Sequence, residues 1–262
     1  MLRSRCMRTR VLVIVLGVAA CSREVEHEGR PISYWIDQMT SADSMVRHRA
    51  VEAFAHDASK SPEAARALMA VLASERDADV HATVAEALGS LGPNALEATP
   101  ALVRLLEDNH IVLRERAAST LGEIGTRSPL VVPALVSALM DPHHDVRAAA
   151  AEALGRIGSG AATGAIPLAR LVQTDGIGWV RVQAAQALGK IGSERDTVIP
   201  ILVRATRSER SELRMAALEA LGHFLAPGAS ADSAITLALR DSNPDVRDAA
   251  VRARNAVRRG TP

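Results

Sequence analysis

The chain has 262 residues, of which 48% are hydrophobic and only 2% aromatic, and its formal net charge is +1. So few aromatic residues exclude a core built on large anchors, and they favour small aliphatic side chains on closely packed helices over a sheet. Four of the 31 basic residues precede residue 11. Without them 27 basic residues face 30 acidic ones, a balance of −3 that does not indicate a nucleic-acid-binding protein.

The N-terminal twenty residues are typical of an export signal. An arginine-bearing stretch precedes the apolar run Val11–Ala20, which is too short to span a bilayer, because a helix needs about 20 apolar residues to do so. The run Val18-Ala19-Ala20-Cys21 resembles the lipobox of bacterial lipoproteins. That resemblance implies cleavage after residue 20 and lipid attachment to Cys21. An ordinary secretory signal with an incidental cysteine is the alternative, and Met7 could replace Met1 as the start.

We therefore divide the chain into a signal peptide (1–20), a polar tether (21–30), a repeat region (31–259) and a tail (260–262). In the lipoprotein family, a serine after the lipidated cysteine, here Ser22, favours the outer membrane over the inner one. The segment Pro31–Met39 is predicted to be a lone helix whose Trp35 covers the first repeat. At the other end, Arg254 replaces a repeated leucine, as expected of a capping repeat with a polar outer face.

A pair of residues, one apolar and one arginine, recurs every 33 or 34 residues between the two caps. The arginines of these pairs, which we call the arginine ladder, are Arg47, Arg114, Arg147, Arg181, Arg214 and Arg247. His81 fills the one gap in the series. A glycine that follows a leucine and a proline repeat at the same interval, so the chain is a tandem array of short units.

Each unit is predicted to contain two helices. In the fourth unit, Val146, Ala150 and Leu154 fall on one helical face, which indicates a first helix. At four of the units an aspartate before the first helix is expected to cap it, and at four a glycine is expected to end it in the left-handed conformation. The aspartates are Asp108, Asp141, Asp175 and Asp241, and the glycines are Gly92, Gly125, Gly158 and Gly192. The second helix is predicted to open with the repeated proline: Pro100, Pro133, Pro167 and Pro200.

The segment Asp145–Gly158 (DVRAAAAEALGRIG) resembles the short HEAT repeat of the phycobilisome-lyase-like class. The resemblance runs from about residue 31 to 259. It implies an all-α fold, a right-handed α-α superhelix of about six full repeats with capping helices, in which the second helices line the concave face. Tetratricopeptide and ankyrin repeats share the period, but the aromatic residues of the first and the Thr-Pro-Leu-His turn of the second are missing.

Two sets of arginines are candidate binding residues. The arginine ladder could bind anions, but each ladder arginine can also pair with the aspartate before the next unit, such as Asp141 or Asp175, and join neighbouring repeats. The second set lies on the second helices: Arg66, Arg104, Arg170, Arg204 and Arg240. Few acids oppose this set, Glu63 and Glu107 being the clearest. We predict a groove that prefers an acidic segment of a partner protein, and a merely solvated face is the alternative.

No catalytic, cofactor-binding or metal-binding residues are predicted. His110 and His143 occupy equivalent positions in adjacent units, roughly 10 Å apart, which is too far for one zinc ion unless His144 also reaches in. The iron-binding deoxyhypusine hydroxylases of this repeat class use repeated His-Glu pairs, and the single pair here, His27-Glu28, lies in the tether. The sequence contains no nucleophile motif or glycine-rich phosphate loop.

We therefore expect a non-catalytic, membrane-tethered scaffold that mediates protein–protein interaction in the bacterial cell envelope. The alternative is a modifying factor, similar to a bilin lyase or a chaperone, that holds a client or a chromophore. A chromophore-handling protein should present apolar or aromatic residues on its concave helices, and the positions expected there are mostly Arg, Ser, Thr and Ala.

Overall fold

A computed structural model describes residues 26–27, 30–57, 62–75, 77–224 and 228–260. The predicted signal peptide, Cys21 and most of the tether lie outside the described residues. None of the helices in the described part of the chain is long and apolar enough to cross a membrane.

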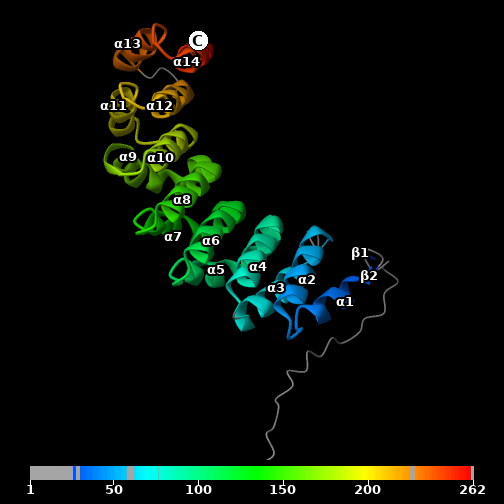
Figure 1. The fold of residues 1–262 in the computed structure, drawn as a ribbon. Helices are drawn as coiled ribbons and strands as arrows, with labels where there is room; N and C mark the ends of the chain where they lie inside the picture. The colour runs from blue at the N-terminus through cyan, green and yellow to red at the C-terminus, as the bar shows by residue number, and fades with distance from the viewer. Residues whose placement is uncertain (1–25, 28–29, 58–61, 76, 225–227, 261–262) are drawn as a thin grey trace, which may run out of the picture.

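The fold is an all-α solenoid of helix pairs stacked in chain order, as predicted (Figure 1). After a short helix α1 (Ile32–Gln38), the first helices of the units are α2 (Ser44–Asp57), α4 (Ala78–Ser90), α6 (Ile111–Ile124), α8 (His144–Ile157), α10 (Gly178–Ile191), α12 (Ser211–His223) and α14 (Pro244–Gly260). The second helices are α3 (Pro62–Ser74), α5 (Thr99–Leu105), α7 (Val131–Ala138), α9 (Ala165–Thr174), α11 (Arg195–Ala205) and α13 (Ala229–Ala238). Short 3-10 helices η1 (Gly92–Ala98), η2 (Gly125–Arg127) and η3 (Gly158–Gly164) connect some of the pairs.

The two ends of the solenoid are closed differently. At the N-terminal end, α1 packs against α2, and Trp35 is only 6% exposed, so this helix covers the first repeat as predicted. The end of the predicted tether forms a short antiparallel pair of strands, in which β1 (Glu26–His27) pairs with β2 (Arg30–Pro31). At the C-terminal end, α14 has no second helix after it in the described chain, and Arg254 is half-buried in the place of the repeated leucine.

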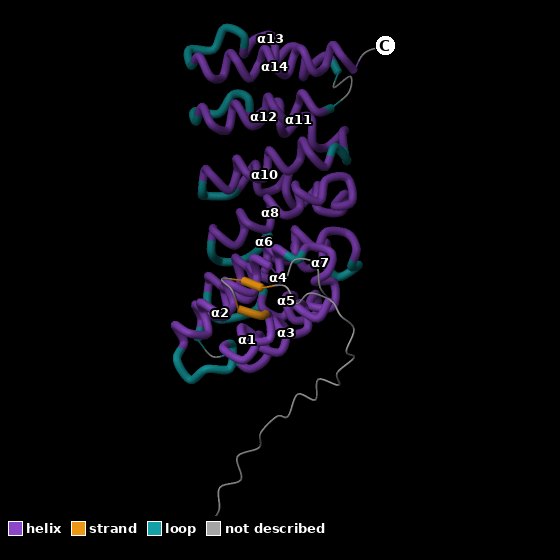
Figure 2. The backbone as a smooth tube through the Cα atoms, turned by 90° about the vertical axis from the view of Figure 1, so that its right-hand side faces the viewer, coloured by secondary structure: helices purple, strands orange, loops and turns teal. Residues whose placement is uncertain are grey.

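The first helices form a closely packed inner row, and the second helices form a more widely spaced outer row (Figures 1 and 2). In Figure 1 the inner row (α2, α4, α6, α8, α10, α12 and α14) follows the inside of the bend, while the outer row (α3, α5, α7, α9, α11 and α13) follows the outside. The expectation that the second helices line the concave face is therefore wrong for this chain. The first helices line the concave face because they approach one another more closely than the second helices do.

Glycine facing alanine allows this close approach. A Cβ atom built on Gly189 of α10 would lie 2.6 Å from the Cα of Ala220 on α12, and one on Gly122 of α6 would lie 2.7 Å from the Cβ of Ala153 on α8. Real Cβ atoms do not come so near to other atoms, so only glycine fits. Between α4 and α6 the partner is Thr120, whose hydroxyl donates a hydrogen bond to the Ala85 carbonyl at 2.8 Å.

Small buried residues complete the inner row. The residue four positions after the apolar member of the repeated pair is fully buried in every unit, as the sequence predicts: Ala50, Val84, Ala117, Ala150, Ala184, Ala217 and Ala250. These side chains fill the space between the two rows. All of them except Ala117 belong to one core that runs the length of the solenoid, together with Phe54 and the five leucines that lie four residues further on in the middle units.

Three local predictions need correction. The four predicted aspartates do not cap the helices, because each accepts the N–H two residues later, in the turn before the helix; Asp77, at the start of α4, does act as a cap. Of the terminal glycines, Gly192 is left-handed, whereas Gly125 and Gly158 combine φ of 69° and 68° with ψ of −153° and −137°, a region that is essentially restricted to glycine. Pro200 lies inside α11 rather than opening it, because that helix begins at Arg195 without a preceding 3-10 turn.

Candidate interaction surface

The arginine ladder connects consecutive units through forked ion pairs. The guanidinium of Arg147 donates from Nε and Nη2 to the two carboxylate oxygens of Asp175, at 2.7 and 3.1 Å. Its Nη1 donates to the carbonyls of Asp141 and Pro142 in the preceding turn. One arginine thus joins the turn before its own helix to the turn before the next.

The same fork is present at three other steps of the solenoid: Arg47 with Glu75, Arg114 with Asp141, and Arg214 with Asp241. Each acid also accepts the N–H two residues later along its own turn, at 2.8 to 2.9 Å. A ladder acid therefore has two tasks, which are to stabilise a turn and to neutralise the arginine of the preceding unit.

Opposing effects determine the pKa of the ladder aspartates. Burial raises the pKa of Asp141 and Asp175, but the hydrogen bonds from the arginine and from the turn N–H outweigh it, so the pKa of each carboxyl lies below its ordinary value. The hydrogen bond from Arg214 is the largest influence on Asp241 and also lowers its pKa. These pairs are therefore ionised at neutral pH.

Two steps interrupt the ladder in opposite ways. At the second unit the acid Asp108 is kept, but His81 replaces the arginine and its Nε2 lies 2.7 Å from the Leu72 carbonyl. At the fifth unit the arginine Arg181 is kept, but Ser208 replaces the acid. The hydroxyl of Ser208 accepts the N–H of Arg210 at 3.2 Å, so it stabilises the turn without supplying a negative charge.

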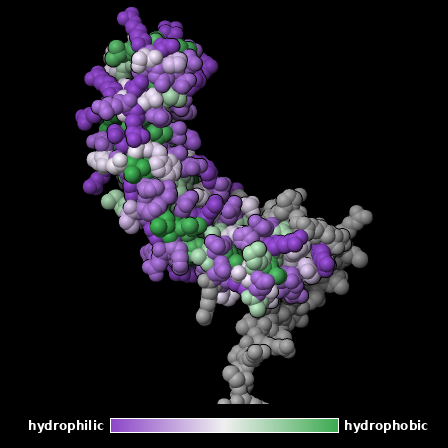
Figure 3. Space-filling model, in the orientation of Figure 1, coloured by the Kyte–Doolittle hydropathy of each residue, from purple (hydrophilic) through white to green (hydrophobic). Residues whose placement is uncertain are grey.

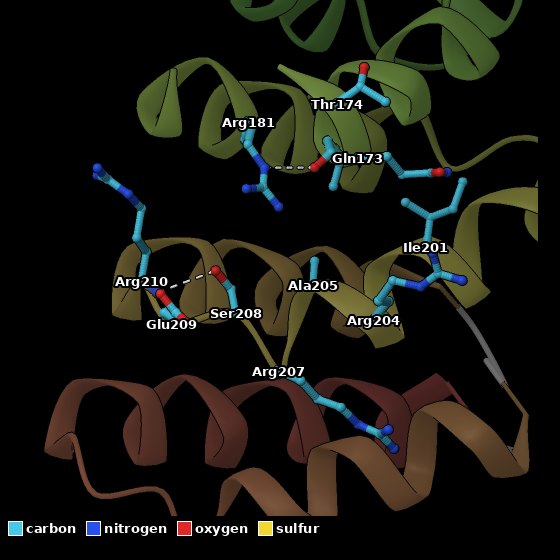
Figure 4. Close-up of a pocket in the computed structure, with 11 residues that line it drawn as sticks. Gln173, Thr174, Arg181, Ile201, Arg204, Ala205, Arg207, Ser208, Glu209 and Arg210 are labelled. Carbon is cyan, nitrogen blue, oxygen red and sulfur yellow. Dashed lines mark hydrogen bonds between the residues drawn. The ribbon is translucent and has the colours of Figure 1, made fainter. Parts of the chain in front are cut away.

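Arg181 adopts a different arrangement from the other ladder arginines. Its Nε donates to the Val172 carbonyl at 2.8 Å, and it makes neither the carboxylate fork nor the contact with the preceding turn. Figure 4 shows the guanidinium of Arg181 directed from α10 into the space that faces Ser208. Its Nη1 and Nη2 groups face this space without a hydrogen-bond partner among the described residues.

The five predicted groove arginines all belong to the outer row or its turns and are exposed: Arg66, Arg104, Arg170, Arg204 and Arg240. They therefore lie on the convex side rather than in a concave groove. Arg204 lines a hollow of about 580 Å³ between α9 and α11, which we call the α9–α11 hollow. Sequence reasoning did not anticipate that Arg181 and Arg210 would join Arg204 there.

The α9–α11 hollow is strongly basic. Arg181, Arg204, Arg207 and Arg210 line it, and Glu209 is the acid among its lining residues. In Figure 4, Arg181 and Ser208 face each other, Arg204 and Arg210 lie on either side, and Arg207 turns toward the next layer of helices. None of the four guanidinium groups forms an ion pair with a described residue.

An equivalent hollow two repeats earlier has the opposite character. This α5–α7 hollow, of about 450 Å³, lies at the same place in the repeat, with Ser137, Met140 and Asp141 in the positions of Arg204, Arg207 and Ser208. Its lining contains no basic residue, and Met140 is 68% exposed. Figure 3 shows the same contrast. Apolar side chains gather near the bend of the solenoid, while the C-terminal part above it is predominantly hydrophilic.

The histidines are placed by the starts of the first helices. His110 and His143 are the residues immediately before α6 and α8. One ligand atom from each of His143, His144 and Asp145 lies within 4.8 Å of the others. The Nδ1 of His143 accepts the N–H of Asp145 at 3.4 Å, and the two imidazole rings stack at 4.6 Å. These contacts serve the start of α8.

Comparison with known proteins identifies the repeat. A family model described as HEAT repeats matches residues 32–121, 99–177 and 167–255. A search of curated proteins finds no match to this chain.

Several solved structures are similar to the chain. The complex of CpcE and CpcF of phycocyanin lyase from Nostoc sp. PCC7120 is 26% identical and has a TM-score of 0.53, covering 93% of this chain and 98% of that chain. An engineered protein is 22% identical with a TM-score of 0.57, covering 87% of this chain and 71% of that chain. A mutant of Kap121p is 12% identical with a TM-score of 0.63, covering 86% of this chain and 29% of that chain. The last two likenesses concern the fold alone.

Proposed function

Because this chain belongs to the HEAT-repeat family, we propose that it is a non-catalytic scaffold that binds another protein in the bacterial cell envelope. Stacked repeats present an extended surface, and proteins of this architecture use such surfaces for binding. The observation that carries the proposal is the row of exposed arginines on the outer helices and their turns: Arg66, Arg104, Arg170, Arg204 and Arg240. A partner with an acidic segment complements this row.

The proposed location in the cell envelope rests on the N-terminal sequence. The lipobox-like run ending at Cys21 supports export and lipid attachment, and the short polar segment before Pro31 would keep the solenoid near the membrane. More than one acyl chain on a residue gives stable anchoring, whereas a single chain binds only marginally. We favour the outer membrane because Ser22 follows the cysteine.

The anchor is tested by mass spectrometry of the N-terminal peptide from the full chain expressed in a bacterium. We expect a lipid-modified peptide that begins at Cys21, and in the Cys21→Ser variant we expect the lipid to be missing. An unmodified Cys21, or a pool of chain that retains residues 1–20, would contradict the anchor.

Partner binding is tested by affinity capture from detergent-solubilised envelope. The triple variant Arg104→Glu, Arg170→Glu and Arg204→Glu should lose the proteins that the wild type retains. A matched triple variant, Arg116→Glu, Arg156→Glu and Arg252→Glu, makes the same change of charge with exposed arginines of the inner row and should retain them. Unchanged capture by the outer-row variant would mean that these arginines do not form the binding surface.

A second candidate function follows from the likeness to the phycocyanin lyase complex, which spans nearly the whole of both chains. The chain would then hold a client or chromophore during its modification. The apolar α5–α7 hollow, with Leu130 and Met140 exposed, is the place that favours it. Native mass spectrometry of the chain purified from its source would show a stoichiometric small molecule if this function holds, and only the bare chain if it does not.

A further inference from the structure

We propose that the α9–α11 hollow is a specific carboxylate-binding site, in which an acidic side chain of the partner takes the place that the ladder aspartate occupies at other steps. The inference rests on the proposed scaffold function and deepens it, because it assigns acid recognition to one step of the solenoid.

The four complete ladder steps show what these arginines bind. In each, the guanidinium receives a carboxylate in a two-pronged fork, with N–O distances between 2.6 and 3.1 Å. This geometry suits an anion that offers two oxygens to the guanidinium fork, and it is stronger than a neutral hydrogen bond. At the fifth step the equivalent arginine, Arg181, faces Ser208, so the arginine is present and its carboxylate is missing.

The shape of the hollow fits an incoming carboxylate. A serine side chain is shorter than an aspartate side chain, and the replacement leaves room above Ser208 that is continuous with the 580 Å³ hollow. The turn beneath is intact, since the serine hydroxyl still accepts the N–H of Arg210. A carboxylate entering this space meets the Nη1 and Nη2 groups of Arg181 without any rearrangement of the backbone.

The surroundings add positive potential. Arg210 lies against the start of α10, where a Cβ atom built on Gly178 would be 2.8 Å from the guanidinium carbon. The N-terminal end of a helix carries a partial positive charge, so Arg210 increases a potential that already favours anions. Arg204 closes the other side of the hollow (Figure 4). Glu209 neutralises only part of this charge.

The α5–α7 hollow provides an internal contrast. There Arg114 and Asp141 are paired with each other, and Glu107 adds a further negative charge to the lining. The position and the fold are the same, but no arginine lines this hollow, and the ladder arginine of this step, Arg114, already holds a carboxylate. The site therefore depends on the loss of the ladder acid at Ser208 and not on the repeat in general.

The binding test uses the purified full chain in a non-ionic detergent and a fluorescently labelled hexa-aspartate peptide, with hexa-asparagine as the uncharged control. Wild type should bind hexa-aspartate, and the variant Ser208→Asp should bind it at least about tenfold more weakly, because its own carboxylate occupies Arg181. The matched variant Ser208→Asn keeps a turn acceptor without the charge and should bind the peptide as wild type does.

Loss of binding in Ser208→Asp cannot come from misfolding if its unfolding temperature equals or exceeds that of wild type, which is the result we expect. Equal affinity of wild type and Ser208→Asp for hexa-aspartate would overturn the site. Binding of a phosphorylated, otherwise neutral peptide without binding of hexa-aspartate would also contradict the proposed carboxylate site. Because the purified chain needs no envelope partner, failure of this test is distinct from a failure to capture one.

Discussion

The inner and outer rows come from the same repeat, yet they differ in how closely successive helices approach one another. In the inner row, glycine faces alanine and leaves no room for a side chain, so the spacing is fixed. In the outer row, successive helices lie further apart, and hollows form between α5 and α7 and between α9 and α11. The inner row thus determines the curvature, whereas the outer row is free to vary its chemistry.

The largest expected effect is on the inner row. Gly189→Val would force a side chain against the backbone of Ala220, and overpacking of this kind costs about 3 kcal/mol or more. Urea unfolding of the full chain measures the loss. Gly176→Val is the control, since nothing lies within 4 Å of a Cβ atom at that position. If both variants lost the same stability, close helix contact would not be what the inner row requires.

The next effect concerns the ladder that joins the units. Asp175→Asn leaves the half-buried guanidinium of Arg147 without its carboxylate, and we expect a loss of about 2–3 kcal/mol in the free energy of unfolding. Ser208→Asn changes the equivalent position at the interrupted step and should cost no more than about 0.5 kcal/mol. Equal losses in the two variants would show that the turn, and not the ion pair, is the stabilising element.

The ladder also predicts how stability depends on pH. Because the folded-state pKa of Asp141, Asp175 and Asp241 is lowered, the pairs contribute fully above the unfolded pKa of about 4, and the contribution disappears as the pH falls through the folded value. The unfolding temperature of wild type should therefore fall more between about pH 5 and pH 3 than that of Asp175→Asn. Parallel curves for the two proteins would contradict this.

The smallest effect is a gain. Ser208→Asp restores the missing ladder acid and should raise the free energy of unfolding by about 1 kcal/mol through a new pair with Arg181. In an Arg181→Gln background the gain should vanish, and the double-mutant cycle isolates the pair. A gain that persists without Arg181 would mean that the new carboxylate stabilises the turn alone.

Sequence reasoning predicted the repeat, the helix pairs, the capping role of Trp35 and the pairing of ladder arginines with the next aspartate. It did not predict which row is concave, because curvature depends on the relative spacing of two rows, and the Gly–Ala contacts that set this spacing appear only when the helices are assembled. The replacement of the ladder acid by Ser208 was not predicted, although Ser208 stands 33 residues after Asp175 in the sequence. The position of Arg210 over Gly178 was not, since it depends on a side-chain conformation.

The most direct test of the account is a crystal structure of the full chain with hexa-aspartate bound. We predict a carboxylate above Ser208, with its two oxygens about 3 Å from the guanidinium of Arg181 and with Arg204 and Arg210 on either side. The α5–α7 hollow should be free of peptide carboxylates. A peptide bound elsewhere, while Arg181 and Ser208 face an empty hollow, would contradict the claim that the interrupted ladder creates the binding site.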